Sequence, residues 1–111
     1  MKDIIKLSAA ELAEKLAAGE LTSVEATQAY IDHIIATDGE PLDAENRAAG
    51  KSGLNAFLHL NAEEALQVAA AVDADRAAGK ELPALAGVPI AVKDLIVTKG
   101  QPTTAASRML E

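Results

Sequence analysis

The sequence contains no cysteine and no tryptophan, and its aromatic residues are one tyrosine and one phenylalanine. Without cysteine the chain can form no disulfide, thiolate nucleophile or cysteine-ligated metal site. Half of the 111 residues are hydrophobic, but alanine supplies much of that fraction. Because alanine buries little area, we expect a thin core and helices that pack closely on a neighbour.

Positive charge is also scarce, since 10 lysine and arginine residues face 17 aspartate and glutamate residues and give a formal net charge of −7. The absence of a basic patch argues against direct binding of nucleic-acid phosphates by this segment. No apolar run reaches the roughly 18 residues that a membrane-spanning helix needs. The opening residues 1–6 are too few and too mixed for a signal peptide. We therefore expect a cytoplasmic chain with no membrane association.

Three segments open with a helix-capping signal, because Ser8, Thr22 and Asn61 are each followed three positions later by glutamate. Gly19 and Gly79 follow two of these segments and predict left-handed helix ends. The expected helices cover residues 9–18, 23–37 and 62–78.

Helical spacing predicts which faces of these helices are buried. The expected buried positions are Leu12, Leu16, Val24, Thr27, Ile31, Ile34, Ile35, Ala65, Leu66, Ala69 and Val72. The charged residues on the other faces are interpreted as solvated, and these are Glu14, Lys15, Asp32, Asp73 and Arg76.

The segments between and after these helices have weaker patterns. Residues 38–53 have three glycines, a proline and mixed charge, which predicts a mobile loop, with weak helical character near residues 44–49. Residues 54–60 and 90–97 predict short strands. His59 has no second histidine or carboxylate at ligand spacing and is interpreted as structural. A helix beginning at Thr103 or Thr104 is expected near the end.

Lys93 lies inside the second apolar segment. An ammonium group taken out of water loses several kcal/mol of solvation unless it is paired or gives up its proton. A buried, neutral lysine can act as a base at neutral pH. On spacing alone, however, a structural pair of Lys93 with Asp94 at a solvent-exposed strand end is the favoured interpretation.

Residues 85–94 (LAGVPIAVKD), 98–100 (TKG) and 103–110 (TTAASRML) resemble the N-terminal part of the amidase signature family. Within the family they are most similar to the A subunits of aspartyl/glutamyl-tRNA amidotransferases. Residues 7–12, 19–25 and 54–58 extend the resemblance over almost the whole chain, with 38–53 as an insertion.

The resemblance implies an α/β fold in which residues 1–111 are the incomplete N-terminal part of an amidase domain. That part would contribute three helices and two or three strands of a larger mixed sheet. The resemblance also implies that Lys93 is the catalytic base of a Ser-Ser-Lys triad. Both triad serines lie further along the family's chain, in a Gly/Ser-rich region with no counterpart here. We therefore expect a piece of a larger enzyme that is inactive alone.

The activity implied by the resemblance is hydrolysis of the glutamine amide, with the ammonia used to amidate mischarged Glu-tRNA(Gln) or Asp-tRNA(Asn). Subunits B and C are the implied partners, and one of these partners would contact most of the tRNA. No cofactor or metal is expected in this chain, whereas ATP and magnesium are expected in a partner subunit. Two alternatives stay open: a stand-alone hydrolase of small amides, and a non-catalytic scaffold or interaction module.

Overall fold

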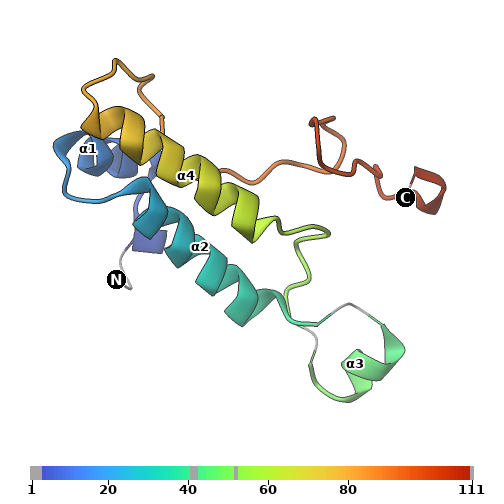
Figure 1. Ribbon diagram of the computed structural model, residues 1–111. Coiled ribbons are helices and arrows are strands. Elements are labelled where there is room, and N and C mark those ends of the chain that lie inside the picture. Colours follow the sequence, from blue (N-terminus) through green and yellow to red (C-terminus); the bar gives the residue numbers. More distant parts are fainter. Residues whose placement is uncertain (1–3, 41–42, 52, 111) are drawn as a thin grey trace.

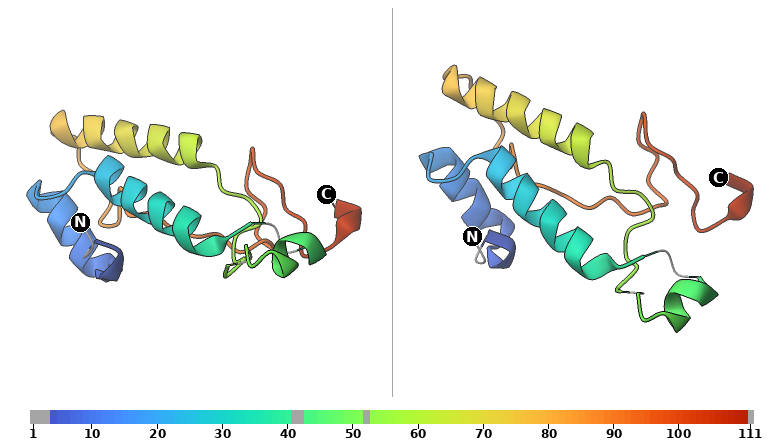
Figure 2. Two further views of the ribbon diagram at one scale, coloured as in Figure 1. Left: turned by 90° about the horizontal axis from the view of Figure 1, so that it is seen from below. Right: turned by 60° about the horizontal axis from the view of Figure 1, so that its bottom comes forward.

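The computed structural model describes residues 4–40, 43–51 and 53–110. Two long helices, α2 (Ser23–Asp38) and α4 (Ala62–Ala77), lie side by side and form the centre of the structure (Figure 1). The shorter α1 (Ala9–Ala18) and the 3₁₀ turn η1 (Ile4–Lys6) lie beside the first half of α2 (Figure 2). The small helix α3 (Ala44–Ala48) and the 3₁₀ turn η2 (Arg108–Leu110) lie away from this helical layer.

Capping side chains start the first two helices where the sequence predicts. Ser8 Oγ accepts a hydrogen bond from the Glu11 amide at 3.2 Å, and the Glu11 carboxylate accepts one from the Ser8 amide at 2.7 Å. Thr22 and Glu25 form the same reciprocal pair at 3.1 and 2.9 Å. Gly19 ends α1 in the left-handed conformation, with φ +72°. All three predicted helices are confirmed, and their ends agree within one residue.

The third predicted capping box is wrong. Asn61 precedes α4, but its side chain makes no hydrogen bond to the helix backbone, and its amide group instead donates to the Glu64 carboxylate. The backbone explains the difference, because Asn61 has ψ 71° rather than the extended value near 160° that aims a capping oxygen at the first turn.

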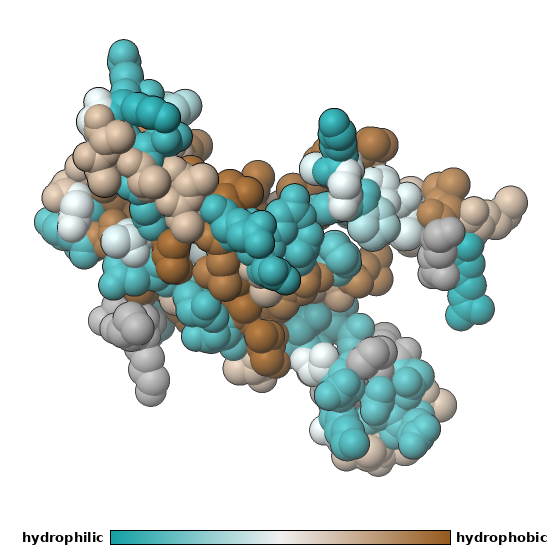
Figure 3. Space-filling view, viewed as in Figure 1, coloured by the Kyte–Doolittle hydropathy of each residue, from teal (hydrophilic) through white to brown (hydrophobic). Residues whose placement is uncertain are grey.

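The core is small, as the scarcity of large side chains predicts. Its buried hydrophobic members are Leu12, Leu16, Ala26, Ile31 and Ala69, and Ser23 and Thr27 are buried with them. Ile35 was expected in this core and is 65% exposed, while Val24 and Ala65 also face solvent. Figure 3 shows apolar surface exposed over the central part of the molecule. No helix in the described part of the chain is long and apolar enough to cross a bilayer.

A group of polar contacts, which we call the Ser23 junction, ties the turn at residues 83–88 to α2 and α4. The Asp73 carboxylate accepts from the Ser23 and Val24 amides at 2.7 and 3.0 Å and so caps α2 from outside. Arg76 Nη2 donates to the Ala86 carbonyl at 3.0 Å, and Ser23 Oγ donates to the Gly87 carbonyl at 2.8 Å. Interpreting Asp73 and Arg76 as merely solvated was therefore wrong, because both bind the backbone of another segment.

The predicted strands at residues 54–60 and 90–97 do not form in this structure, whose described residues contain helices and irregular segments. A strand needs a regular ladder of backbone hydrogen bonds to a second segment. Here the amides of residues 54 and 55 donate to the Thr37 and Asp38 carbonyls at the end of α2, and the Asp94 carbonyl accepts from the Ala105 amide, but these bonds do not continue into a ladder. Residues 56 and 57 instead donate their amides to the two carboxylate oxygens of Asp38, at 2.5 and 3.2 Å. The mixed sheet stays a prediction.

Residues 38–53 contain α3, in agreement with the weak helical character of residues 44–49. Asp43 caps it by accepting from the Asn46 amide at 2.7 Å. The two ends of the segment meet where the Glu40 amide donates to the Lys51 carbonyl at 3.1 Å. The mobility of this segment stays a prediction.

Candidate functional site

Lys93 lies in an extended segment that leaves the Ser23 junction and runs away from the helices. Its side chain is exposed, and so are its apolar neighbours, among them Ile90 at 82% and Val97 at 85%. The sequence predicted a lysine buried in an apolar strand, and in this chain that burial is absent. The physical reason is that the nearby residues 56–59 and 105–106 leave an open hollow beside Lys93 and do not bury its side chain.

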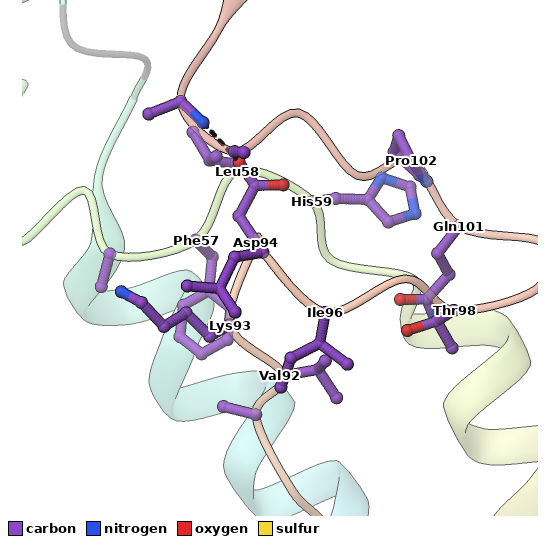
Figure 4. A pocket seen from close by; sticks show the side chains of 15 residues that line it. Phe57, Leu58, His59, Val92, Lys93, Asp94, Ile96, Thr98, Gln101 and Pro102 are labelled. Carbon is purple, nitrogen blue, oxygen red and sulfur yellow. Dashed lines mark hydrogen bonds between the residues drawn. The ribbon is translucent and has the colours of Figure 1, made fainter. Parts of the chain in front are cut away.

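A hollow of about 690 Å³ lies between residues 56–59 and the segment that carries Lys93. In Figure 4 the side chains of Lys93 and Phe57 lie at one end of this hollow, and His59, Gln101 and Pro102 lie at the other. His59, which the sequence indicated as structural, thus shares a cavity with Lys93. No group of three potential metal ligands occurs among the described residues.

The structural pair of Lys93 with Asp94 does not form. The salt bridges of the described residues are Lys15–Glu20 and Lys80–Asp75, and Lys93 takes part in neither. The Asp94 carboxylate instead accepts hydrogen bonds from the Thr104 amide at 2.8 Å, the Thr104 hydroxyl and the Ala106 amide at 3.1 Å. These donors, led by Thr104, hold the pKa of Asp94 below its ordinary value.

The sequence interpretation named Asp94 only as a partner of Lys93 and missed its bonds to Thr104 and Ala106. Thr104 was expected to cap a helix beginning there, but it binds Asp94, and only residues 108–110 form a short 3₁₀ turn. The only sequence signal was the pair Thr103 and Thr104, nine and ten residues after Asp94, and this spacing is too common to predict a contact.

The three serines in the described part of the chain do not join Lys93 in the hollow. Ser8 caps α1, Ser23 belongs to the junction with α4, and Ser107 Oγ accepts from the Met109 amide at 3.3 Å. None of these three lines the hollow, and Ser52 lies outside the described residues. The described residues therefore supply a lysine without the two serines of a triad.

Comparison with known proteins identifies consistent relatives. Residues 44–111, more than half of the chain, match the amidase family. The whole chain is 68% identical to the A subunit of glutamyl-tRNA(Gln) amidotransferase from Renibacterium salmoninarum. It is 58% identical over 98% of its length to the protein of that name from Paenarthrobacter aurescens, and 51% identical over its whole length to that from Thermobifida fusca. The chain spans about a fifth of the length of these relatives, 19%, 19% and 20% respectively. No solved structure matches it.

Proposed function

Because the chain belongs to the amidase family, we propose that it is the N-terminal part of the glutamine-hydrolysing subunit of a tRNA-dependent amidotransferase. The observation that carries the proposal is the 68% identity over all 111 residues to a protein named as the A subunit of glutamyl-tRNA(Gln) amidotransferase. The resemblance to the amidase signature family, first drawn from residues 85–110, is thereby confirmed over the full chain.

In the proposed reaction, a serine hydroxyl attacks the amide carbon of glutamine, and Lys93 accepts the proton through a second serine. The C–N bond breaks as the nitrogen leaves with a proton, and water then cleaves the acyl-enzyme to release glutamate and free serine. The described residues supply only the base, so the serines would come from protein outside this chain. Lys93 supports the role by its place within the amidase match and at the edge of a hollow large enough for a small amide.

The exposed apolar segment around Lys93 supports a larger fold. We propose that residues 54–60 and 90–97 become strands of a mixed sheet when the remainder of an amidase domain packs on them. Such packing would cover Ile90 and Val97, and it would surround Lys93 with the low-dielectric environment that favours its neutral form.

The proposed complex assigns other tasks to other chains. We propose subunits B and C as partners, with ATP and magnesium bound by a partner and the mischarged tRNA held mainly there, in the cytoplasm where translation takes place. The net charge of −7 supports this division, because an acidic chain repels tRNA phosphates.

The test uses a chimera in which this chain replaces the 111 matching residues of the Renibacterium relative, assembled with that organism's partner subunits. We expect Lys93→Ala to lower glutamine hydrolysis by about 10²–10⁴-fold, the usual contribution of a general base. The melting temperature should not fall, because the substitution breaks neither salt bridge of the described residues and removes an amine that is costly to desolvate.

Lys99→Ala is the matched control, since this exposed lysine lies six positions further on, outside the hollow. Substantial glutaminase activity in the Lys93→Ala chimera would remove Lys93 from the triad. Faster release of ammonia from simple amides than from glutamine by the full-length parent of this chain would instead favour a stand-alone amidase.

A further inference from the structure

We infer that Asp94 is a positioning residue for the proposed base: it fastens residues 104–106 to the backbone that carries Lys93, and so holds one wall of the hollow in a single arrangement. This inference rests on the proposed function, because a positioned lysine matters to the reaction only if the lysine takes part in it.

Four hydrogen bonds join Asp94 to three consecutive residues. One carboxylate oxygen accepts from the Thr104 amide at 2.8 Å, and the other accepts from the Thr104 hydroxyl and from the Ala106 amide at 3.1 Å. The Asp94 carbonyl accepts the fourth, from the Ala105 amide at 3.1 Å. Asp94 therefore binds this loop through both its side chain and its backbone, and it lies in the hollow beside Lys93 (Figure 4).

The loop adopts a backbone conformation that needs such an anchor. Ala105 and Ala106 have φ values of +47° and +61°, in the left-handed region that residues with a Cβ rarely occupy. Two successive alanines keep this conformation only when surrounding contacts favour it over the alternatives. The bonds to Asp94 are these contacts, since they engage the amides on both alanines and the residue before them.

The backbone of Lys93 is held by hydrogen bonds next to those of Asp94, although the Lys93 side chain is exposed. Its carbonyl accepts a hydrogen bond from the Ile96 amide at 3.0 Å, and the Ile96 carbonyl in turn accepts from the Thr103 hydroxyl at 3.3 Å. Residues 93–96 and 103–106 thus form one hydrogen-bonded unit. Loosening this unit would change where the Lys93 amine lies relative to any bound amide.

The chemistry requires a carboxylate at this position. Three donors converge on two side-chain oxygens of Asp94, and both oxygens are used. An asparagine has the same size, but in either orientation its NH₂ group would face at least one donor. Asp94→Asn should therefore open the loop without creating a cavity.

The experiment measures kcat and KM for glutamine in the chimera with its partner subunits. We expect Asp94→Asn to lower kcat by about 10–100-fold, because displacing a catalytic group by up to about 1 Å has an effect of this size. KM should stay within about twofold, because the binding contacts of glutamine are unchanged. Thr104→Val removes only the hydroxyl donor and should lower kcat less than Asp94→Asn does. Thr104→Ser keeps the hydroxyl and should have the kcat of the unmodified chimera.

Asp32→Asn is the matched control, because this exposed carboxylate accepts from Gln28 on α2, far along the chain from the hollow, and the amide oxygen can replace it. An unchanged kcat in Asp94→Asn, or equal losses in Thr104→Val and Thr104→Ser, would overturn the positioning role while leaving the proposed function intact. Absence of glutaminase activity in the unmodified chimera would overturn the proposed function and this inference with it.

Discussion

At the scale of single residues, Gly87 is a position where a side chain would require its neighbours to shift. Its φ is +88°, and a Cβ there would lie 3.0 Å from both Cβ and Oγ of Ser23 and 3.3 Å from a methyl carbon of Val72. We expect Gly87→Ala to destabilise the chain by about 1–3 kcal/mol, because it combines an unfavourable backbone conformation with a displaced Ser23 junction. The measurement is the midpoint of urea unfolding, monitored by circular dichroism at 222 nm.

Gly79→Ala separates the two causes. Gly79 has a similar φ of +74° at the end of α4, but a Cβ there would meet nothing within 4 Å. Its replacement should therefore lower the free energy of unfolding only by the cost of the left-handed backbone conformation, about 1 kcal/mol. Equal shifts for the two variants would show that close contact with Ser23 contributes nothing to stability.

The residue scale also shows where sequence reasoning stops. The contacts of Ser23 with Asp73 and Gly87 join positions 50 and 64 residues apart, and no local pattern indicates such a pairing. Lys93 was singled out as a cation in an apolar run, but its proposed role as a base came from the family resemblance, since spacing alone favoured a pair with Asp94. The bonds that Asp94 makes instead were missed because its partners are ordinary threonine and alanine residues ten and twelve positions later.

At the scale of elements, the two capping boxes that form should contribute more to the free energy of unfolding than the Asn61 position, where no box forms. We expect Ser8→Ala and Thr22→Ala each to cost about 1 kcal/mol, because each leaves a helix amide without its partner. Asn61→Ala should cost clearly less, since the Asn61 side chain makes no bond to the backbone of α4. Urea unfolding of the three variants tests this order, and a larger loss for Asn61→Ala would contradict the observed start of α4.

The same boxes predict how helix stability depends on pH. Hydrogen bonds from the backbone and side chain of Ser8 lower the pKa of Glu11, and those from Thr22 lower the pKa of Glu25. Because the folded-state pKa lies below the unfolded one, this stabilisation is complete above the unfolded-state pKa and is lost as the pH falls through the folded-state pKa.

We therefore expect the urea midpoint to fall on acidification within this window. Glu11→Gln combined with Glu25→Gln should weaken that dependence, because glutamine can occupy a capping box without titrating. An unchanged pH profile in the double variant would show that other carboxylates control the acid sensitivity.

The predicted helices are confirmed while the strands stay a prediction, for a reason that belongs to this scale. The ends of α1 and α2 are set by residues within one turn, such as Ser8 and Gly19, so the sequence contains the whole signal. A strand at 54–60 or 90–97 depends on a neighbouring strand, and the described residues offer none. The exposed position of Ile35 has a related cause, because helical spacing identifies an apolar face but cannot say whether anything packs on it.

At the scale of the whole molecule, the chain is extended and rich in uncovered apolar surface. Its radius of gyration is 16.2 Å, against about 13 Å for a compact domain of this length. Leu54, Leu58, Ile90 and Val97 are all more than 70% exposed. Exposed apolar side chains in such number are typical of a surface that packs against other protein.

The last prediction follows from that surface and concerns assembly from two pieces. We expect this chain, co-expressed with the Renibacterium relative from which the 111 matching residues have been deleted, to co-purify with that piece and to restore glutamine hydrolysis. Ile90→Glu with Val97→Glu should abolish co-purification, since two charges would be buried without partners. Ala17→Glu on the exposed side of α1 is the control and should leave assembly unchanged.

The Lys93→Ala chain should assemble normally but show no glutamine hydrolysis, which separates packing from chemistry. Assembly that survives both glutamate substitutions would show that the segment carrying Lys93 is not part of the contact.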